Sequence, residues 1–200
     1  MLNLRISELP GSSYDWPAVK PKSVDQLQQI GIFILVLFGV HLINFVSGMW
    51  LNRFGIIPRT FRGLQGILFS PLLHANWSHL AANAAPLAVM LCLVAFGSRQ
   101  PMWPITISIW VISGTAIWLV GRPGSVQIGA SALIYGLAAF LVTEAWVKRD
   151  LKSALVALLV IVLYGGIVWG LLPTRQGVSW EGHLCGVAAG ILVAKIGWVA

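Results

Sequence analysis

Six polar residues lie in or beside stretches that are otherwise apolar enough to cross a membrane: His74, His79, Asn83, Ser131, Glu181 and His183. Polar groups are costly in hydrocarbon, so inside membrane segments they usually mark a functional site. A histidine beside a serine can take the hydroxyl proton and make the oxygen a nucleophile. The residue types therefore indicate a serine hydrolase built on Ser131 and His183. Taken singly, each residue has another explanation: a small residue at a close helix contact, or a hydrogen bond between helices.

Two further side chains can stabilise the oxyanion that such an attack creates. His79 and Asn83 are four residues apart, so they face the same way on a helix. Both can donate hydrogen bonds, and the backbone N–H of Ser131 can complete an oxyanion hole. A zinc site made by His74, His79 and His183 is the alternative. It lacks the His-x3-His spacing of a helical zinc site and a neighbouring Glu, so we expect no metal and no cofactor.

The composition requires a membrane around these residues. The 200 residues are 58% hydrophobic and 10% charged, with a mean hydropathy of +0.84, and apolar runs of about 20 residues recur along the chain. We predict an all-α polytopic membrane protein. The net charge of +7 comes from basic residues scattered singly between apolar runs, which indicates topology signals and contacts with lipid headgroups, not nucleic acid. Cys92 and Cys185 lie in apolar segments and are expected to be buried thiols.

Six membrane spans are predicted, at residues 28–51, 78–97, 102–121, 130–147, 152–172 and 180–199. A polar tail precedes them at residues 1–27, with no cleavable signal peptide. The connector at residues 52–77 is too apolar for a solvated loop, so we expect it to lie in the membrane interface as short helices. Lys and Arg are more numerous on the side of the two termini, which favours cytoplasmic termini. His79, Ser131 and His183 then open spans two, four and six near the outer face.

Spans four and six carry small residues that favour close packing. His183, Gly186 and Gly190 share one face of span six, and Gly186-x-x-x-Gly190 lets another helix approach closely. The facing set on span four consists of Gly129, Tyr135 and Gly136. Close packing of these spans would bring His183 within hydrogen-bond reach of Ser131.

No acidic residue is placed to complete the pair. Glu181 is two residues before His183 and so points to another face of the helix. We therefore expect a Ser–His pair without an acid, in which the ring of Tyr135 can hold the imidazole by stacking.

Three stretches together resemble the rhomboid intramembrane serine proteases, in the order and on the spans that this family uses. They are His74-Ala-Asn-Trp-Ser-His79-Leu-Ala-Ala-Asn83, Gly129-Ala-Ser131-Ala-Leu-Ile-Tyr135-Gly136 and Gly182-His183-Leu-Cys-Gly186-Val-Ala-Ala-Gly190. The resemblance implies a six-transmembrane-helix rhomboid-like bundle, with residues 52–77 as its membrane-embedded first loop. It implies these roles: Ser131 as nucleophile, His183 as general base packed on Tyr135, His79, Asn83 and the Ser131 amide as oxyanion donors, and His74 in support.

Two departures from the family pattern stand out. Ala132 follows the nucleophile where the family often has glycine, which crowds the turn but removes no catalytic group. The Trp-Arg pair often found in the family's first loop has no clear match, although Arg53, Arg59 and Arg62 are nearby.

The resemblance implies an intramembrane serine endopeptidase that cuts transmembrane segments of other membrane proteins near the outer membrane boundary. Its partners would be transmembrane substrates and membrane lipids, in a prokaryotic plasma membrane; the oligomeric state stays open. One alternative is an inactive rhomboid-like protein that binds transmembrane helices, although such relatives lose the serine or histidine that this chain keeps. A small transporter or channel would show polar groups at mid-bilayer depth and inverted repeats, and we detect neither.

Overall fold

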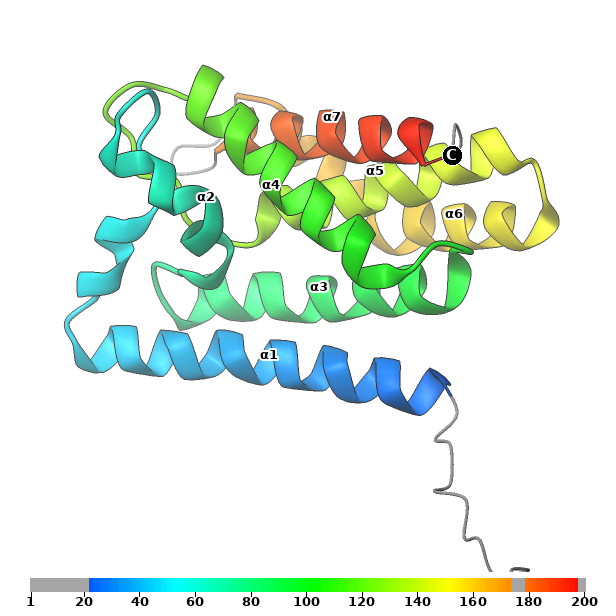
Figure 1. Ribbon diagram of the computed structural model, residues 1–200, viewed down its shortest axis with the longest axis horizontal. Coiled ribbons are helices and arrows are strands. Elements are labelled where there is room, and N and C mark those ends of the chain that lie inside the picture. Colours follow the sequence, from blue (N-terminus) through cyan, green and yellow to red (C-terminus); the bar gives the residue numbers. More distant parts are fainter. Residues whose placement is uncertain (1–21, 174–178, 198–200) are drawn as a thin grey trace, which may run out of the picture.

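The computed structural model describes residues 22–173 and 179–197. In this part of the chain the long helices lie side by side, with α1 packed outside α3 at one edge and α4 crossing the bundle (Figure 1). They are α1 (Lys22–Val46), α3 (Trp77–Gly97), α4 (Met102–Val120), α5 (Ser131–Lys148), α6 (Leu151–Tyr164) and α7 (Trp180–Ile196). The described residues form helices and no strand beyond one isolated pairing of Ile56 with Gln127. The predicted all-α fold is confirmed.

Five stretches among the described residues are helical, long and apolar enough to cross a membrane. They are Val24–Val46, Trp77–Gly97, Met102–Val120, Ser131–Lys148 and Leu151–Leu171. These helices indicate a multi-pass integral membrane protein, as predicted. The predicted sixth span coincides with α7, which has 17 residues, and its crossing of the membrane stays a prediction. Of the predicted tail, residues 1–21 lie outside the described residues, and α1 already begins at Lys22.

The connector between α1 and α3 forms four short helices: η2 (Trp50–Phe54), η3 (Arg62–Gln65), α2 (Gly66–Phe69) and η4 (Ser70–Leu72). Indole N–H groups of α4 fasten it, because Trp110 Nε1 donates to the Ile67 carbonyl at 2.8 Å and Trp118 Nε1 to the Thr60 carbonyl at 2.8 Å. Arg59 donates to two carbonyls at the end of α4. The connector is thus an ordered layer on α4, while its place in the membrane interface stays a prediction.

Helices α5 and α7 touch backbone to backbone through small residues. A Cβ added to Gly186 would lie 2.9 Å from the carbonyl carbon of Ala132, and one on Gly190 would lie 2.8 Å from that of Gly136. Real Cβ atoms essentially never come so close, so only glycine allows this spacing. The two contacts follow one another by four residues on both helices. α5 and α7 therefore run parallel, with their first residues at the same end of the bundle.

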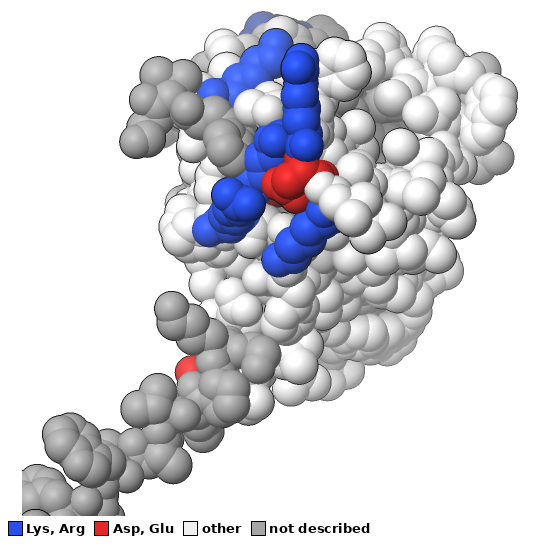
Figure 2. Space-filling view, turned by 90° about the vertical axis from the view of Figure 1, so that its right-hand side faces the viewer, with Lys and Arg blue, Asp and Glu red and all other residues white. Residues whose placement is uncertain are grey.

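Exposed basic side chains gather at the other end of α5, as Figure 2 shows. The set lies where α3 joins α4, where α5 joins α6 and at the end of α7: Arg99, Arg149, Lys152 and Lys195. Beneath them, the buried Glu144 carboxylate pairs with Lys148 and accepts a hydrogen bond of 2.7 Å from Ser98 Oγ. Exposed arginines also lie at the Ser131 end of the bundle, at Arg53, Arg59, Arg62 and Arg122, so the predicted orientation, with cytoplasmic termini and Ser131 toward the outer face, stays a prediction.

Candidate active site

Ser131 is the first residue of α5, at the end of a loop that leads back from α4. The loop is pinned by Gly129, whose N–H donates to the Ser70 carbonyl at 2.8 Å. Gly129 has a φ of +111°, a conformation that favours glycine. A Cβ there would lie 2.9 Å from Cε1 and Nε2 of His79. The loop backbone therefore lies against the His79 ring at Gly129, two residues before Ser131.

His79 is held at the start of α3 by the cap of that helix. Asn76 Oδ1 accepts the His79 N–H at 2.8 Å, the usual way in which Asn satisfies the first turn of a helix. The Ala75 N–H donates to His79 Nδ1 at 3.3 Å, which leaves the ring proton on Nε2, the atom that faces Gly129. Asn83 is 4% exposed and donates from Nδ2 to the His79 carbonyl at 2.8 Å. Its amide keeps a second N–H for another acceptor.

His183 is buried in the first turns of α7, which Ser179 caps by accepting the Gly182 N–H. Its ring stacks on Tyr135 of α5, with centroids 4.0 Å apart and planes 8° apart. Two backbone carbonyls of η5 (Gly165–Leu171) hold the two rings. His183 Nδ1 lies 2.8 Å from the Gly170 oxygen, and Tyr135 Oη donates to the Ile167 oxygen at 2.6 Å.

A cavity of about 640 Å³ joins these groups. It is lined by α3, α5, η5, α7 and the loop before α5, and its polar lining includes His79, Asn83, Ser131, Tyr135 and His183. The structure thus brings the predicted nucleophile, base and oxyanion donors to one space. Within the described residues no hydrogen bond joins the Ser131 hydroxyl to a histidine.

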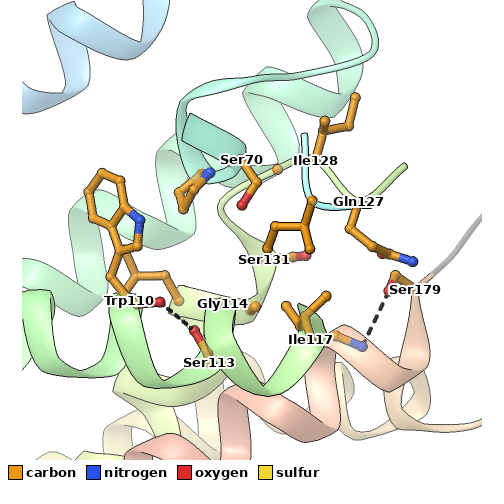
Figure 3. Close-up of a pocket in the computed structure, with 15 residues that line it drawn as sticks. Ser70, Trp110, Ser113, Gly114, Ile117, Gln127, Ile128, Ser131 and Ser179 are labelled. Atoms are coloured by element: carbon orange, nitrogen blue, oxygen red, sulfur yellow. Dashed lines mark hydrogen bonds between the residues drawn. The ribbon is translucent and has the colours of Figure 1, made fainter. Parts of the chain in front are cut away.

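A second, smaller cavity of about 30 Å³ is also lined by Ser131. Figure 3 shows Ser131 there, with the side chains of Ser70, Ser113, Gln127 and Ser179 around the same space. A space of this volume with some polar side chains in its lining has room for about one water molecule.

His74 lies beside this arrangement, in a row of rings formed with His41 and His79. The His74 centroid is 5.2 Å from that of His79 and 6.4 Å from that of His41, which comes from α1 and was not singled out by the sequence. Burial, and to a smaller extent the neighbouring His79, lower the pKa of His74 from 6.5 to about 4. His74 is therefore neutral near pH 7 and suited to packing. Among the described residues no three His, Cys, Asp or Glu side chains form a group that can hold a metal ion.

Glu181, which the sequence left without a role, forms an ion pair across the site. Its Oε1 accepts from Nε of Arg122 at 3.1 Å and from Nη2 at 3.0 Å. Arg122 lies in the loop that leads to Ser131, and Glu181 is in the first turn of α7. The pair therefore ties the loop that leads to Ser131 to the helix that carries His183.

Known proteins share this sequence pattern. The family model of the Rhomboid domain matches residues 62–199, which include every residue that lines the large cavity. The chain belongs to the rhomboid family. Helix α1 lies outside the matched region. Members of this family are generally intramembrane serine proteases.

The chain is also similar to uncharacterized mycobacterial proteins. It is 42% identical over 173 residues to one of Mycobacterium tuberculosis and one of Mycobacterium bovis, which covers 82% of this chain and 72% of each relative. With a Mycobacterium leprae protein it shares 38% identity over 173 residues, 82% of this chain and 68% of that relative.

Proposed function

We propose that this rhomboid is an intramembrane serine endopeptidase that cleaves transmembrane segments of other membrane proteins. The observation that carries the proposal is the single cavity lined by Ser131, His183, His79 and Asn83. Three separate parts of the sequence supply a nucleophile, a base and oxyanion donors to it, the combination that acyl transfer requires.

In the proposed reaction His183 Nε2 takes the hydroxyl proton as Ser131 Oγ attacks the scissile carbonyl. His183 then gives the proton to the leaving amine, and water, activated by the same imidazole, hydrolyses the acyl-enzyme. The developing oxyanion would be met by His79 Nε2–H, the free amide N–H of Asn83 and the N–H of Ser131. Because Ser131 is the first residue of α5, its N–H has no acceptor within the helix, and the helix dipole there favours negative charge.

The substrate must present an unwound segment, since a helix shields its carbonyls with internal hydrogen bonds. We therefore expect small or helix-breaking residues near the cut, close to the outer membrane boundary. The site needs water and no cofactor.

An inactive rhomboid that binds transmembrane helices is the second candidate. One observation favours it, since the Ser131 hydroxyl has no hydrogen bond to His183 among the described residues. Catalytic hydrogen bonds are often long without substrate and shorten when it binds. We therefore prefer the protease function over the binding function.

Cleavage of a defined transmembrane substrate by the full chain in detergent tests the proposal. We expect wild type and Ser108→Ala, a serine of α4 away from the large cavity, to cleave equally. Ser131→Ala should be inactive, and His183→Ala should be slower by about 10²–10⁴-fold. Equal cleavage by wild type and Ser131→Ala would refute the proposed serine protease function. Specific binding of the substrate without cleavage would support the second candidate.

A further inference from the structure

Among the described residues no carboxylate forms a hydrogen bond or ion pair with the proposed base, yet its protonation has to be fixed. A neutral imidazole carries one proton, on Nδ1 or on Nε2, and only the form with the proton on Nδ1 can accept the serine proton at Nε2. In serine proteases of the Ser-His-Asp type a carboxylate on the Nδ1 side makes this choice. In the structure, Glu181 pairs with Arg122 instead.

The atom on the Nδ1 side of His183 is the main-chain oxygen of Gly170, at 2.8 Å. A carbonyl oxygen can only accept a hydrogen bond, so His183 Nδ1 must donate. The proton then sits on Nδ1, and Nε2 keeps a free lone pair. The backbone thus selects the form of the imidazole that a base requires.

The sequence around Gly170 explains why its carbonyl is available. α6 ends at Tyr164 and continues as the 3-10 helix η5 to Leu171. In a 3-10 helix the Gly170 carbonyl would accept from residue 173, which is Pro173 and has no N–H. The last carbonyls of a helix lack partners within the helix. His183 satisfies one of them.

Glycine at position 170 is needed for the approach of the two rings. A Cβ there would lie 3.2 Å from His183 Nδ1 and 3.2 Å from Cζ of Tyr135, and still closer to the Tyr135 hydroxyl. That hydroxyl is itself bonded to the Ile167 carbonyl of the same segment. Both stacked rings are therefore positioned by η5.

We propose that the main-chain carbonyl of Gly170 takes the place of the missing acid and holds His183 with its proton on Nδ1, which makes Gly170 a positioning residue of the Ser131–His183 pair. The inference rests on the proposed function. His79 is set the opposite way, because the Ala75 N–H donates to its Nδ1 and leaves the proton on Nε2. The backbone thereby gives one histidine the form of a base and the other the form of an oxyanion donor.

Nitrogen-15 NMR of histidine-labelled protein in detergent tests this directly, at about pH 8, where ordinary histidines are neutral. Spectra of His183→Gln and His79→Gln identify the two rings by difference. We expect the one-bond proton coupling on Nδ1 of His183 and on Nε2 of His79. A proton on Nε2 of His183 would overturn the proposal.

Two alanine variants of η5 give a second, kinetic test. Gly170→Ala pushes on His183 and Tyr135, and a displacement of about 1 Å costs about 100-fold in rate, so kcat should fall about 100-fold with little change in KM. Gly166→Ala is the control, because a Cβ there meets nothing within 4 Å, and it should behave like wild type. Adding Tyr135→Phe to Gly170→Ala removes the closest contact and should recover part of the loss. Wild-type kcat in Gly170→Ala would refute the positioning role.

The two failures can be told apart. If the wild type cleaves no substrate but His183 carries its proton on Nδ1, the protease proposal fails while the backbone assignment stands. If the wild type cleaves and the proton is on Nε2, the assignment fails alone.

Discussion

Replacing Gly190 by alanine tests whether the spacing of α5 and α7 builds the site. The new Cβ would lie 2.8 Å from the carbonyl carbon of Gly136 and 2.9 Å from the backbone nitrogen of Phe140, whereas ordinary contact begins at 3.4 Å. The two backbones must therefore separate by about 0.6 Å or more. His183 lies two helical turns earlier on α7 and would move with it, away from Ser131.

The energetic terms oppose each other, and overpacking outweighs propensity. Alanine gains about 1 kcal/mol over glycine in a helix, while overpacking costs about 1–3 kcal/mol and more where only backbone is present to yield. We expect the free energy of unfolding to fall by about 1–2 kcal/mol. A shift of His183 by about 1 Å should lower kcat/KM about 100-fold.

The assay compares substrate cleavage and denaturant unfolding of Gly190→Ala with those of Gly39→Ala. Gly39 lies in α1, where a Cβ meets nothing within 4 Å, so this control should keep full activity and wild-type stability or slightly more. Cleavage is measured at a temperature where both variants are folded by circular dichroism. Wild-type activity and stability in Gly190→Ala would refute the reasoning.

Three further predictions follow from the site. Glu181→Gln removes the ion pair with Arg122 and should lower the free energy of unfolding. The loss should be only about 1 kcal/mol, because solvent screens the exposed Arg122 side of the pair. The double exchange Arg122→Glu/Glu181→Arg should recover part of this loss. Between pH 6.5 and 4 His74 is protonated in the unfolded chain but stays neutral in the folded protein. Lowering the pH through this range should therefore lower the free energy of unfolding, measured in denaturant titrations, by up to about 3 kcal/mol. His74→Leu should remove this pH-dependent loss. Gly129→Ala combines an unfavourable φ with a clash against His79, so cleavage should fall by about 100-fold.

Two of these predictions have a matched control variant. Gly124 also has a positive φ, +75°, but a Cβ there meets nothing within 4 Å, so Gly124→Ala should cost stability and keep activity. Arg62→Gln, at an exposed arginine without an ion pair among the described residues, should leave stability unchanged. Equal losses of activity in Gly129→Ala and Gly124→Ala would contradict the prediction for Gly129. A denaturation midpoint of Glu181→Gln equal to that of wild type would contradict the ion-pair prediction. A wild-type dependence of stability on pH in His74→Leu would contradict the histidine prediction.

The sequence was sufficient for the elements that depend on local patterns. Apolar runs predicted the long helices, with α5 beginning at Ser131 where residue 130 was expected. α3 begins at Trp77, next to the predicted residue 78, because Asn76 caps it. Small residues and the stacking of Tyr135 on His183 could be anticipated because helical spacing decides which side chains share a face.

Contacts between distant segments could not be predicted. Residues 152–172 were expected as one continuous span, but α6 changes to a 3-10 helix at Gly165, and no side-chain pattern shows which ring its carbonyls would meet. Arg122 and Glu181 are 59 residues apart, so their pairing depends on the packing of the loop against α7. His41 joins the row of histidines only because α1 packs against the segment just before α3, which contains His74.

The central claim, that Ser131 is a nucleophile activated by His183, is tested most directly by fluorophosphonate labelling of the full chain followed by mapping of the adduct by mass spectrometry. We predict a single adduct on Ser131, lost in Ser131→Ala and formed about 10²–10⁴-fold more slowly in His183→Ala. Substrate cleavage that persists without an adduct on Ser131, or an adduct that forms at the same rate without His183, would contradict the account.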